Sequence, residues 1–198
     1  MDDVPEIERL RQDIEFAADL PRRGRSLRFR TTWGLFSPRG LDDGTRLLLD
    51  HFAAGPADAT FDLGCGYGPI GLALATDSPR GRVTMVDRDF LAVEYANRNA
   101  QSNGLTNAVA RLGHGFAGTP SQERFDNVVS NLPAKTGGEM LRVLLFDAHR
   151  HLKPGGRMCV VTVTGLRRFI ERHMRAQFGN YDKLKQSPGY TVALAVKE

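Results

Sequence analysis

The chain has 198 residues, of which 41% are hydrophobic and 25% charged, and it carries a formal net charge of +4. This length fits one α/β domain with a short appendage, and the composition is ordinary for a globular protein. Because the start is acidic and no apolar run approaches the roughly 18 residues of a membrane span, we expect a cytoplasmic protein without a membrane partner. Two cysteines, Cys65 and Cys159, predict neither a disulfide framework nor a metal site, and we expect both to be buried and reduced.

Residues 5–20 have the spacing of an amphipathic helix. Ile7, Leu10 and Ile14 recur at helical intervals, and Pro21 would end the helix. We therefore predict an N-terminal helical extension over residues 1–24, followed by one main domain over residues 25–198.

Arginine is concentrated between Asp19 and Asp42, in a stretch without acidic residues. Its members are Arg22, Arg23, Arg25, Arg28, Arg30 and Arg39. Guanidinium groups bind phosphate bidentately, so this block predicts a surface that contacts RNA. The alternative is a solvated face in an arginine-rich chain.

Residues 27–36 alternate between apolar and polar side chains, which predicts a strand. Leu27, Phe29 and Trp33 would pack on one face, and Arg28 would lie on the other. Trp33 could instead stack on a base, as could the aromatic residue at position 36.

From residue 59 onward, strand and helix patterns alternate. Strands are expected at 59–63, 83–87, 108–112, 126–130 and 157–163, and helices at 69–76, 89–103, 138–151 and 166–178. This order predicts a mostly parallel sheet with helices on both faces, and residues 179–197 predict an antiparallel strand pair at the C-terminus. Ligands of such sheets bind at the carboxyl ends of the strands, where the polar loops of this chain should converge.

A glycine turn joins the first of these strands to its helix over residues 61–71. Gly64, Gly66 and Gly68 let the backbone turn sharply and bring its N–H groups close to a ligand, so a side chain there would occupy the space of that ligand. Gly71 would let the helix pack closely on the strand. The segment therefore predicts a cofactor loop of the nucleotide-binding type.

Two carboxylates indicate which cofactor this is. Asp62, just before the glycines, would repel the pyrophosphate of a dinucleotide but attract a ligand that carries an ammonium and a sulfonium group. Asp87, about 20 residues after Gly66, would accept hydrogen bonds from ribose hydroxyls in either ligand class. These charges favour S-adenosyl-L-methionine over NAD.

The run Asp62-Leu63-Gly64-Cys65-Gly66-Tyr67-Gly68 resembles the first motif of the class I S-adenosylmethionine-dependent methyltransferases, which has the form D-x-G-C-G-x-G. The resemblance implies a Rossmann-like α/β fold with S-adenosyl-L-methionine as cofactor. The cofactor-binding residues that it implies are Asp62, Gly64, Cys65, Gly66, Gly68, Asp87, Arg88, His114, Gly115 and Asn131. His114 stands where relatives usually have Asp or Asn to accept from the adenine amino group. Phe90 would either lie on the adenine or pack in the core.

A second resemblance lies in residues 36–49, which have the form F-S-x-x-x-x-D-x-G-T-x-L-L-L. They are similar to the small-subunit ribosomal RNA guanine-N2 methyltransferases, in which this loop helps to close over the cofactor. Ser37, Asp42, Gly44 and Thr45 are thereby candidates to support the site, and helix capping is their alternative role. From the residues themselves, we expect Asp43 or Thr45 as the N-cap of the helix that follows.

The segment Asn131-Leu132-Pro133-Ala134 resembles the N-P-P-[aromatic] motif of methyltransferases that act on exocyclic or amide nitrogens. In that family the Asn oxygen and the next carbonyl each accept one amino hydrogen, which implies Asn131, Leu132 and Pro133 as catalytic residues. Ala134 replaces the aromatic residue that normally stacks on a flipped base, so either another aromatic residue such as Trp33 or Phe36 substitutes, or the substrate is not the one that the family implies.

Together these patterns predict an N-methyltransferase for the exocyclic amine of a guanine in ribosomal RNA. The alternatives are a methyltransferase for a protein amide or a small metabolite, and a cofactor-binding RNA module without catalysis. The oligomeric state is left open.

Overall fold

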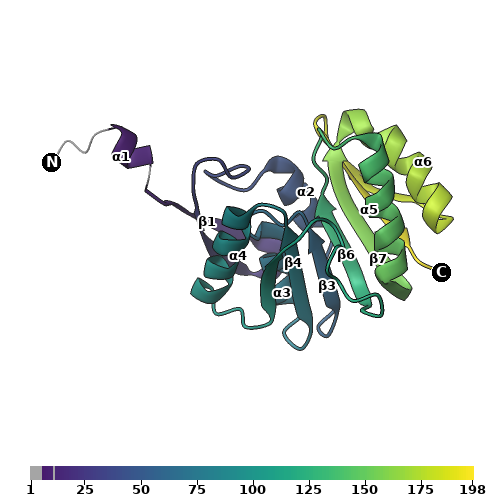
Figure 1. Cartoon of the computed structure of the whole chain (residues 1–198), viewed down its shortest axis with the longest axis horizontal. Coiled ribbons are helices and arrows are strands. Elements are labelled where there is room, and N and C mark those ends of the chain that lie inside the picture. Colours follow the sequence, from purple (N-terminus) through teal and green to yellow (C-terminus); the bar gives the residue numbers. More distant parts are fainter. Residues whose placement is uncertain (1–5, 11) are drawn as a thin grey trace.

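The computed structural model describes residues 6–10 and 12–198. Its centre is a seven-stranded sheet in the order β5-β4-β3-β6-β7-β9-β8 (Figure 1). The strands are β3 (Ala59–Leu63), β4 (Arg82–Asp87), β5 (Ala108–Leu112), β6 (Phe125–Asn131), β7 (Leu152–Val163), β8 (Asp182–Gln186) and β9 (Tyr190–Val196). Strands β3 to β7 pair in parallel, whereas β9 runs antiparallel to both β7 and β8. The predicted mostly parallel sheet with an antiparallel C-terminal pair is confirmed.

Helices cover both faces of this sheet, as predicted. One face packs against α2 (Asp43–His51), α3 (Pro69–Asp77) and α4 (Phe90–Ser102), and the other packs against α5 (Gly138–His151) and α6 (Arg167–Phe178), which follows the short turn η2 (Thr164–Leu166). Adjacent strand residues serve opposite cores: Val129 and Cys159 lie in the first, and Val128 and Met158 in the second. Burial on both faces explains why these strands read as continuous apolar runs.

The predicted N-terminal helix is wrong beyond Leu10. After the short helix α1 (Glu6–Leu10), the chain forms β1 (Ile14–Leu20), the turn η1 (Pro21–Arg23) and β2 (Arg25–Thr31), and the two strands pair as an antiparallel hairpin. Alternate side chains of β1, such as Ala18 and Leu20, are buried, whereas Ile7 is 63% exposed. Pairing with β2 thus overrode the helical spacing. The hairpin spans position 24, which is the predicted end of the N-terminal helical extension.

Two asparagines of α4 join the hairpin to the domain. Asn103 accepts from the Arg28 N–H (2.9 Å) and donates to the Arg28 carbonyl (2.7 Å), and Asn99 makes the same pair with Arg30 (2.7 and 2.9 Å). These side chains satisfy the outer edge of β2 as a neighbouring strand would. Asn99 also donates to the Tyr67 carbonyl (3.0 Å), so it connects the hairpin to the glycine loop.

Within 6–10 and 12–198, no helix is long and apolar enough to cross a membrane, and no three His, Cys, Asp or Glu side chains are grouped to hold a metal ion. Cys65 and Cys159 are free and buried, as predicted. Burial raises the pKa of both thiols, so neither is a ready nucleophile.

Candidate active site

Four polar loops meet at the carboxyl ends of the parallel strands. They follow β3, β4, β5 and β6, which lie side by side in the sheet with β3 between β4 and β6 (Figure 1). The chain proceeds from β3 toward one edge of the sheet and then returns to β6 on the other side. Ligands of open α/β sheets bind at this kind of reversal in strand order. The predicted convergence of the loops is therefore confirmed.

The glycine loop after β3 has the backbone that its sequence requires. Gly64, Gly66 and Gly68 all have positive φ, at 71°, 55° and 95°. A Cβ added at Gly64 or Gly66 would meet nothing within 4 Å, so there is open space beside the loop at these two positions. Gly68 instead faces α3 and α4, where a Cβ would lie 3.2 Å from Leu72 and 3.4 Å from Ala96. The first two glycines leave room for a ligand, and the third allows close packing.

Asp62 lies beneath this loop and is fully buried. Its Oδ2 accepts from the Gly71 N–H (2.8 Å), and its Oδ1 has no hydrogen-bond partner among the described residues. Desolvation raises the pKa of Asp62 to about 7; the Gly71 N–H opposes this rise, and the charge of Asp87 adds to it. Because the carboxylate is buried, it acts on the glycine loop and on the local potential.

Close packing around Asp62 explains the fourth glycine. A Cβ at Gly71 would lie 2.5 Å from Met85 and 2.9 Å from Asp62 Oδ2, both too short for a real contact. The start of α3 therefore packs directly on β3 and β4, as predicted.

Asp87, at the end of β4, supports the glycine loop from the side. Its Oδ2 accepts from the Gly66 N–H (2.8 Å) and its Oδ1 from the Asp89 N–H (3.0 Å). A carboxylate has about four acceptor sites, so both oxygens can still accept from a ligand hydroxyl. Arg88 is exposed beside it, and Phe90 is 65% exposed, which excludes the core position for that ring.

The loop after β5 is attached to the same place. The Gly113 N–H donates to the Asp87 carbonyl (2.9 Å), which brings His114 and Gly115 next to the end of β4. His114 is exposed, and Gly115 has φ of 63° with Leu144 3.0 Å from where its Cβ would be. These residues line the side of the site that is farther from β6.

Asn131 ends β6, and its side-chain amide is held by two residues from the start of α2. Its Nδ2 donates to Asp42 Oδ2 (2.9 Å) and to Thr45 Oγ1 (3.1 Å). Asp42, not Asp43 or Thr45, is the N-cap of α2, since its Oδ2 also accepts from the Thr45 N–H (3.1 Å). Tyr190 of β9 completes the group by donating to Asp42 Oδ1 (2.9 Å). Sequence reasoning missed Tyr190 because it lies 148 residues from Asp42 and no local pattern connects them.

The two residues after Asn131 have different environments. Leu132 is buried, and its N–H donates to the Val161 carbonyl (2.9 Å), which holds the peptide between Asn131 and Leu132 against β7. Pro133 is exposed and accepts from the Thr136 N–H (3.1 Å) through its carbonyl. Because a residue before proline has restricted backbone angles, Pro133 also limits the direction of the Leu132 carbonyl.

Two exposed aromatic side chains lie in the loop between β2 and α2. The predicted core position of Trp33 is wrong: β2 ends at Thr31, and Trp33 is 38% exposed with the Arg39 guanidinium 4.6 Å from its ring centroid. Phe36 is 66% exposed. Tyr67 of the glycine loop donates to the Ser37 and Gly40 carbonyls (3.2 and 3.1 Å), so the loop between β2 and α2 lies against the glycine loop.

The arginine block divides into structural and exposed members. Arg23, with only 6% of its side chain exposed, pairs with Asp77 (2.8 Å) and donates to the carbonyls of Leu49 and Phe52, so its predicted place on an RNA surface is wrong. Arg30 pairs with Glu15 of β1 (2.8 Å). Arg22 is hydrogen-bonded to the Asp50 carbonyl but remains exposed, and Arg25, Arg28 and Arg39 are exposed as well.

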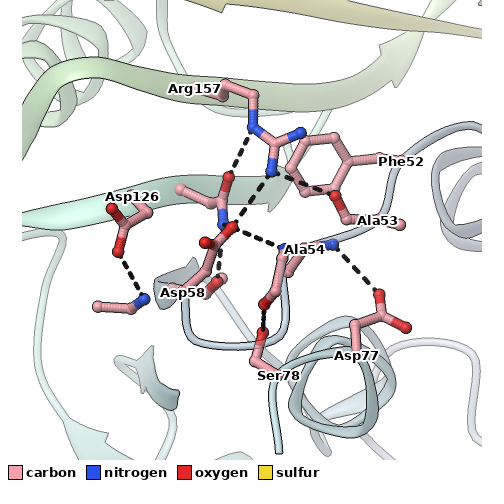
Figure 2. Close-up of polar contacts among 12 residues, drawn as sticks. Phe52, Ala53, Ala54, Asp58, Asp77, Ser78, Asp126 and Arg157 are labelled. Atoms are coloured by element: carbon pink, nitrogen blue, oxygen red, sulfur yellow. Dashed lines mark hydrogen bonds and ion pairs between the residues drawn. The ribbon is translucent and has the colours of Figure 1, made fainter. Parts of the chain in front are cut away.

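A second polar cluster lies at the other end of the parallel strands, near their amino ends (Figure 2). It borders a hollow of about 500 Å³. Arg157 donates to Asn127 Oδ1 (2.9 Å), to the Ala53 carbonyl (3.2 Å) and to Asp58 Oδ2 (3.3 Å). Asp58 also accepts from the Gly55 N–H (2.7 Å). Because these groups satisfy one another and hold the α2–β3 connection to β6 and β7, we assign this cluster a structural role.

Comparison with known proteins gives a family match over nearly all of the main domain. The family model described as "Methyltransferase small domain" matches residues 26–194. The uncharacterized protein YbxB of Bacillus subtilis is 32% identical over 178 residues, which is 88% of each chain. Ribosomal RNA small subunit methyltransferase C of Klebsiella pneumoniae is 36% identical over 143 residues, which is 69% of this chain but 40% of that relative.

A solved structure shows the same arrangement. The T. thermophilus 16S rRNA N2 G1207 methyltransferase (RsmC), in complex with AdoMet and guanosine, superposes with a TM-score of 0.85 and 26% sequence identity. The match covers 94% of this chain and 51% of that one. The chain thus spans about half the length of these RNA methyltransferases, and the residues that the family model matches include the four loops of the site.

Proposed function

The chain belongs to the methyltransferase small domain family, and from this membership we propose that it is an S-adenosylmethionine-dependent N-methyltransferase for the exocyclic amine of a guanine in ribosomal RNA. Relatives named for ribosomal RNA methylation, and a structural neighbour in complex with AdoMet and guanosine, support both ligand classes. The observation that carries the proposal is the held amide of Asn131 beside the glycine loop.

The glycine loop and its carboxylates fit the cofactor. The open space beside Gly64 and Gly66 admits a ligand against the backbone, and the half-buried Asp87 can accept from ribose hydroxyls. The negative potential of Asp62 favours a cationic group over a pyrophosphate. When bound, S-adenosylmethionine supplies an electrophilic methyl group.

The catalytic contribution of the chain is then mainly to position the target amine. Asp42 and Thr45 use both hydrogens of the Asn131 amide, so Oδ1 is the atom of that group available to accept from an amine. The Leu132 carbonyl, whose direction is limited by Pro133, would accept the second amine hydrogen. Accepting both hydrogens localises the nitrogen lone pair and directs it, which requires no general base before the attack.

Exposed groups near the site would bind the RNA. Trp33 and Phe36 are accessible aromatic rings on the loop next to the glycine loop. Either can therefore stack on the base in place of the aromatic residue that Ala134 replaces. Arg25 and Arg28 would contact phosphates, and Arg39 lies on the Trp33 ring where it can do the same.

The test is single-turnover methyl transfer from labelled cofactor to ribosomal RNA taken from a strain that lacks the gene. We expect Asn131→Ala to lower turnover by roughly 10²–10³ with little change in cofactor affinity, because the lost contact strengthens as the amine becomes pyramidal. Asn131→Asp, which keeps an acceptor oxygen, should retain more activity than Asn131→Ala.

Two results would contradict the proposal. Label recovered in protein or in small molecules, with none in RNA, would favour the other substrate classes. Equal rates for the wild type and Asn131→Ala would show that this segment is not the catalytic motif.

A further inference from the structure

The orientation of the Asn131 amide is determined by its partners. The Asp42 carboxylate can only accept hydrogen bonds, so the amide must present Nδ2 to Asp42 Oδ2, at 2.9 Å. A flipped amide would place two oxygens against each other and would also lose the donor to Thr45. Within the described residues no hydrogen bond is made to Asn131 Oδ1, which leaves that atom as the acceptor for a substrate.

The Asp42 carboxylate accepts two hydrogen bonds besides the one from Asn131. As the N-cap of α2 it accepts from the Thr45 N–H (3.1 Å), and its Oδ1 accepts from the Tyr190 hydroxyl (2.9 Å). A Cβ at Gly44 would lie 2.7 Å from the Tyr190 ring, so the first turn of α2 packs directly on β9. The hydrogen bond to Asp42 raises the pKa of Tyr190, so the phenol stays a donor over the whole physiological range. The group thus joins residues from β6, α2 and β9.

We propose that Asp42, supported by Tyr190, is a positioning residue for methyl transfer that holds Asn131 with its oxygen toward the target amine. This inference rests on the proposed function. A carboxylate that accepts from an amide N–H polarises the amide, which makes Oδ1 a stronger acceptor. The sequence resemblance assigned this aspartate only a supporting role in loop closure or capping.

Two substitutions separate positioning from capping. Asp42→Ser keeps a good N-cap residue but is too short to reach both Asn131 and Tyr190, so helix α2 should be retained while the amide is released. Asp42→Asn keeps the cap and an acceptor oxygen, and its amide can donate to the Tyr190 oxygen, so only the charge is lost. We expect Asp42→Ser to lower kcat by roughly 10–100-fold and Asp42→Asn to recover most of that loss.

KM for RNA and the cofactor Kd should change less than about threefold in both variants. Tyr190→Phe should lower kcat to a smaller extent, because it removes one contact of Asp42 but leaves the ring against Gly44. The matched control is Tyr95→Phe, which removes another tyrosine hydroxyl bonded to an aspartate, Asp13, and should leave kcat unchanged. A purely structural role would instead change the melting temperature of the Asp42 variants together with kcat.

A readout independent of activity is the ¹H–¹⁵N side-chain amide signal of Asn131, assigned from its disappearance in Asn131→Asp. In the wild type both amide protons should be shifted as in hydrogen-bonded amides, and in Asp42→Ser they should move toward free values. An active wild type whose Asp42→Ser variant keeps full kcat, with the amide signals moved, overturns the positioning role alone. A wild type that transfers no methyl group to RNA overturns the proposed function, and this role with it.

Discussion

Asp62 should make the stability of the protein depend on pH in an unusual direction. The carboxyl is fully buried, one of its oxygens has no partner among the described residues, and its pKa is raised to about 7, chiefly by desolvation. Replacing it with asparagine keeps an oxygen to accept from the Gly71 N–H and removes the group that ionises. The comparison of wild type with Asp62→Asn therefore isolates the cost of burying this charge.

The sign follows from proton binding. Between about pH 4 and pH 7 the folded protein keeps the Asp62 proton, and the unfolded chain has lost it, so the folded state binds more protons. The free energy of unfolding should then fall as pH rises through this window, by about 1.4 kcal/mol per pH unit and by about 4 kcal/mol in total. Above about pH 7 both states are ionised and this contribution becomes constant.

Chemical denaturation of both proteins at pH 5, 6, 7 and 8 would measure the effect. Between pH 5 and pH 8 the free energy of unfolding of the wild type should fall by about 3 kcal/mol relative to that of the variant; taking the difference cancels the titration of the histidines and other groups. Cofactor affinity should rise with pH in the wild type only, since a cation favours the ionised carboxylate. A stability difference that stays constant from pH 5 to pH 8 would refute the argument that desolvation dominates at Asp62.

Three other experiments test separate features of the protein. Asp87→Ala should weaken cofactor binding by about 1.5–3 kcal/mol in calorimetry, and equal affinity would remove Asp87 from the ribose site. Replacing both Arg25 and Arg28 with alanine should reduce the magnitude of the slope of log K for RNA binding against log salt concentration by about 1.4. Replacing the charge-matched pair Lys183 and Lys185, on the edge strand β8, with alanine should leave that slope unchanged. Arg23→Ala should cost about 3–5 kcal/mol of stability by leaving Asp77 buried and unpaired, without changing that slope; an unchanged melting temperature would contradict its structural role.

Much of the domain was predictable because its signals are local. Each strand and helix of the α/β part depends on periodicity within one segment, so the strand at 108–112 and the helix at 138–151 were predicted with their observed bounds. The glycine loop was equally legible, since positive φ at Gly64 and Gly66 is a requirement of the backbone itself. Boundaries were less certain where a strand continued through a turn: β7 begins at Leu152, five residues before the predicted start.

The N-terminal segment shows where local patterns were insufficient. Residues 14–20 fit a helical spacing, but β2 offered a partner whose apolar residues matched an alternation of two. Trp33 continues that alternation in the sequence, yet the strand ends at Thr31 and the ring lies at the surface. In both cases the local pattern was not sufficient to predict where the residues lie in the folded protein.

The sequence by itself determined the sheet, its helices, the cofactor loop and the position of Asn131 at a strand end. The tertiary structure decided which arginines remain at the surface, because Arg23 forms an ion pair with Asp77, 54 residues away. It also decided the direction of the Asn131 amide, through Asp42 at a separation of 89 residues and Tyr190 at 148 from Asp42. Hydrogen bonds over such separations leave no periodic trace in the chain, because they depend on where folded elements meet and not on the residues beside them.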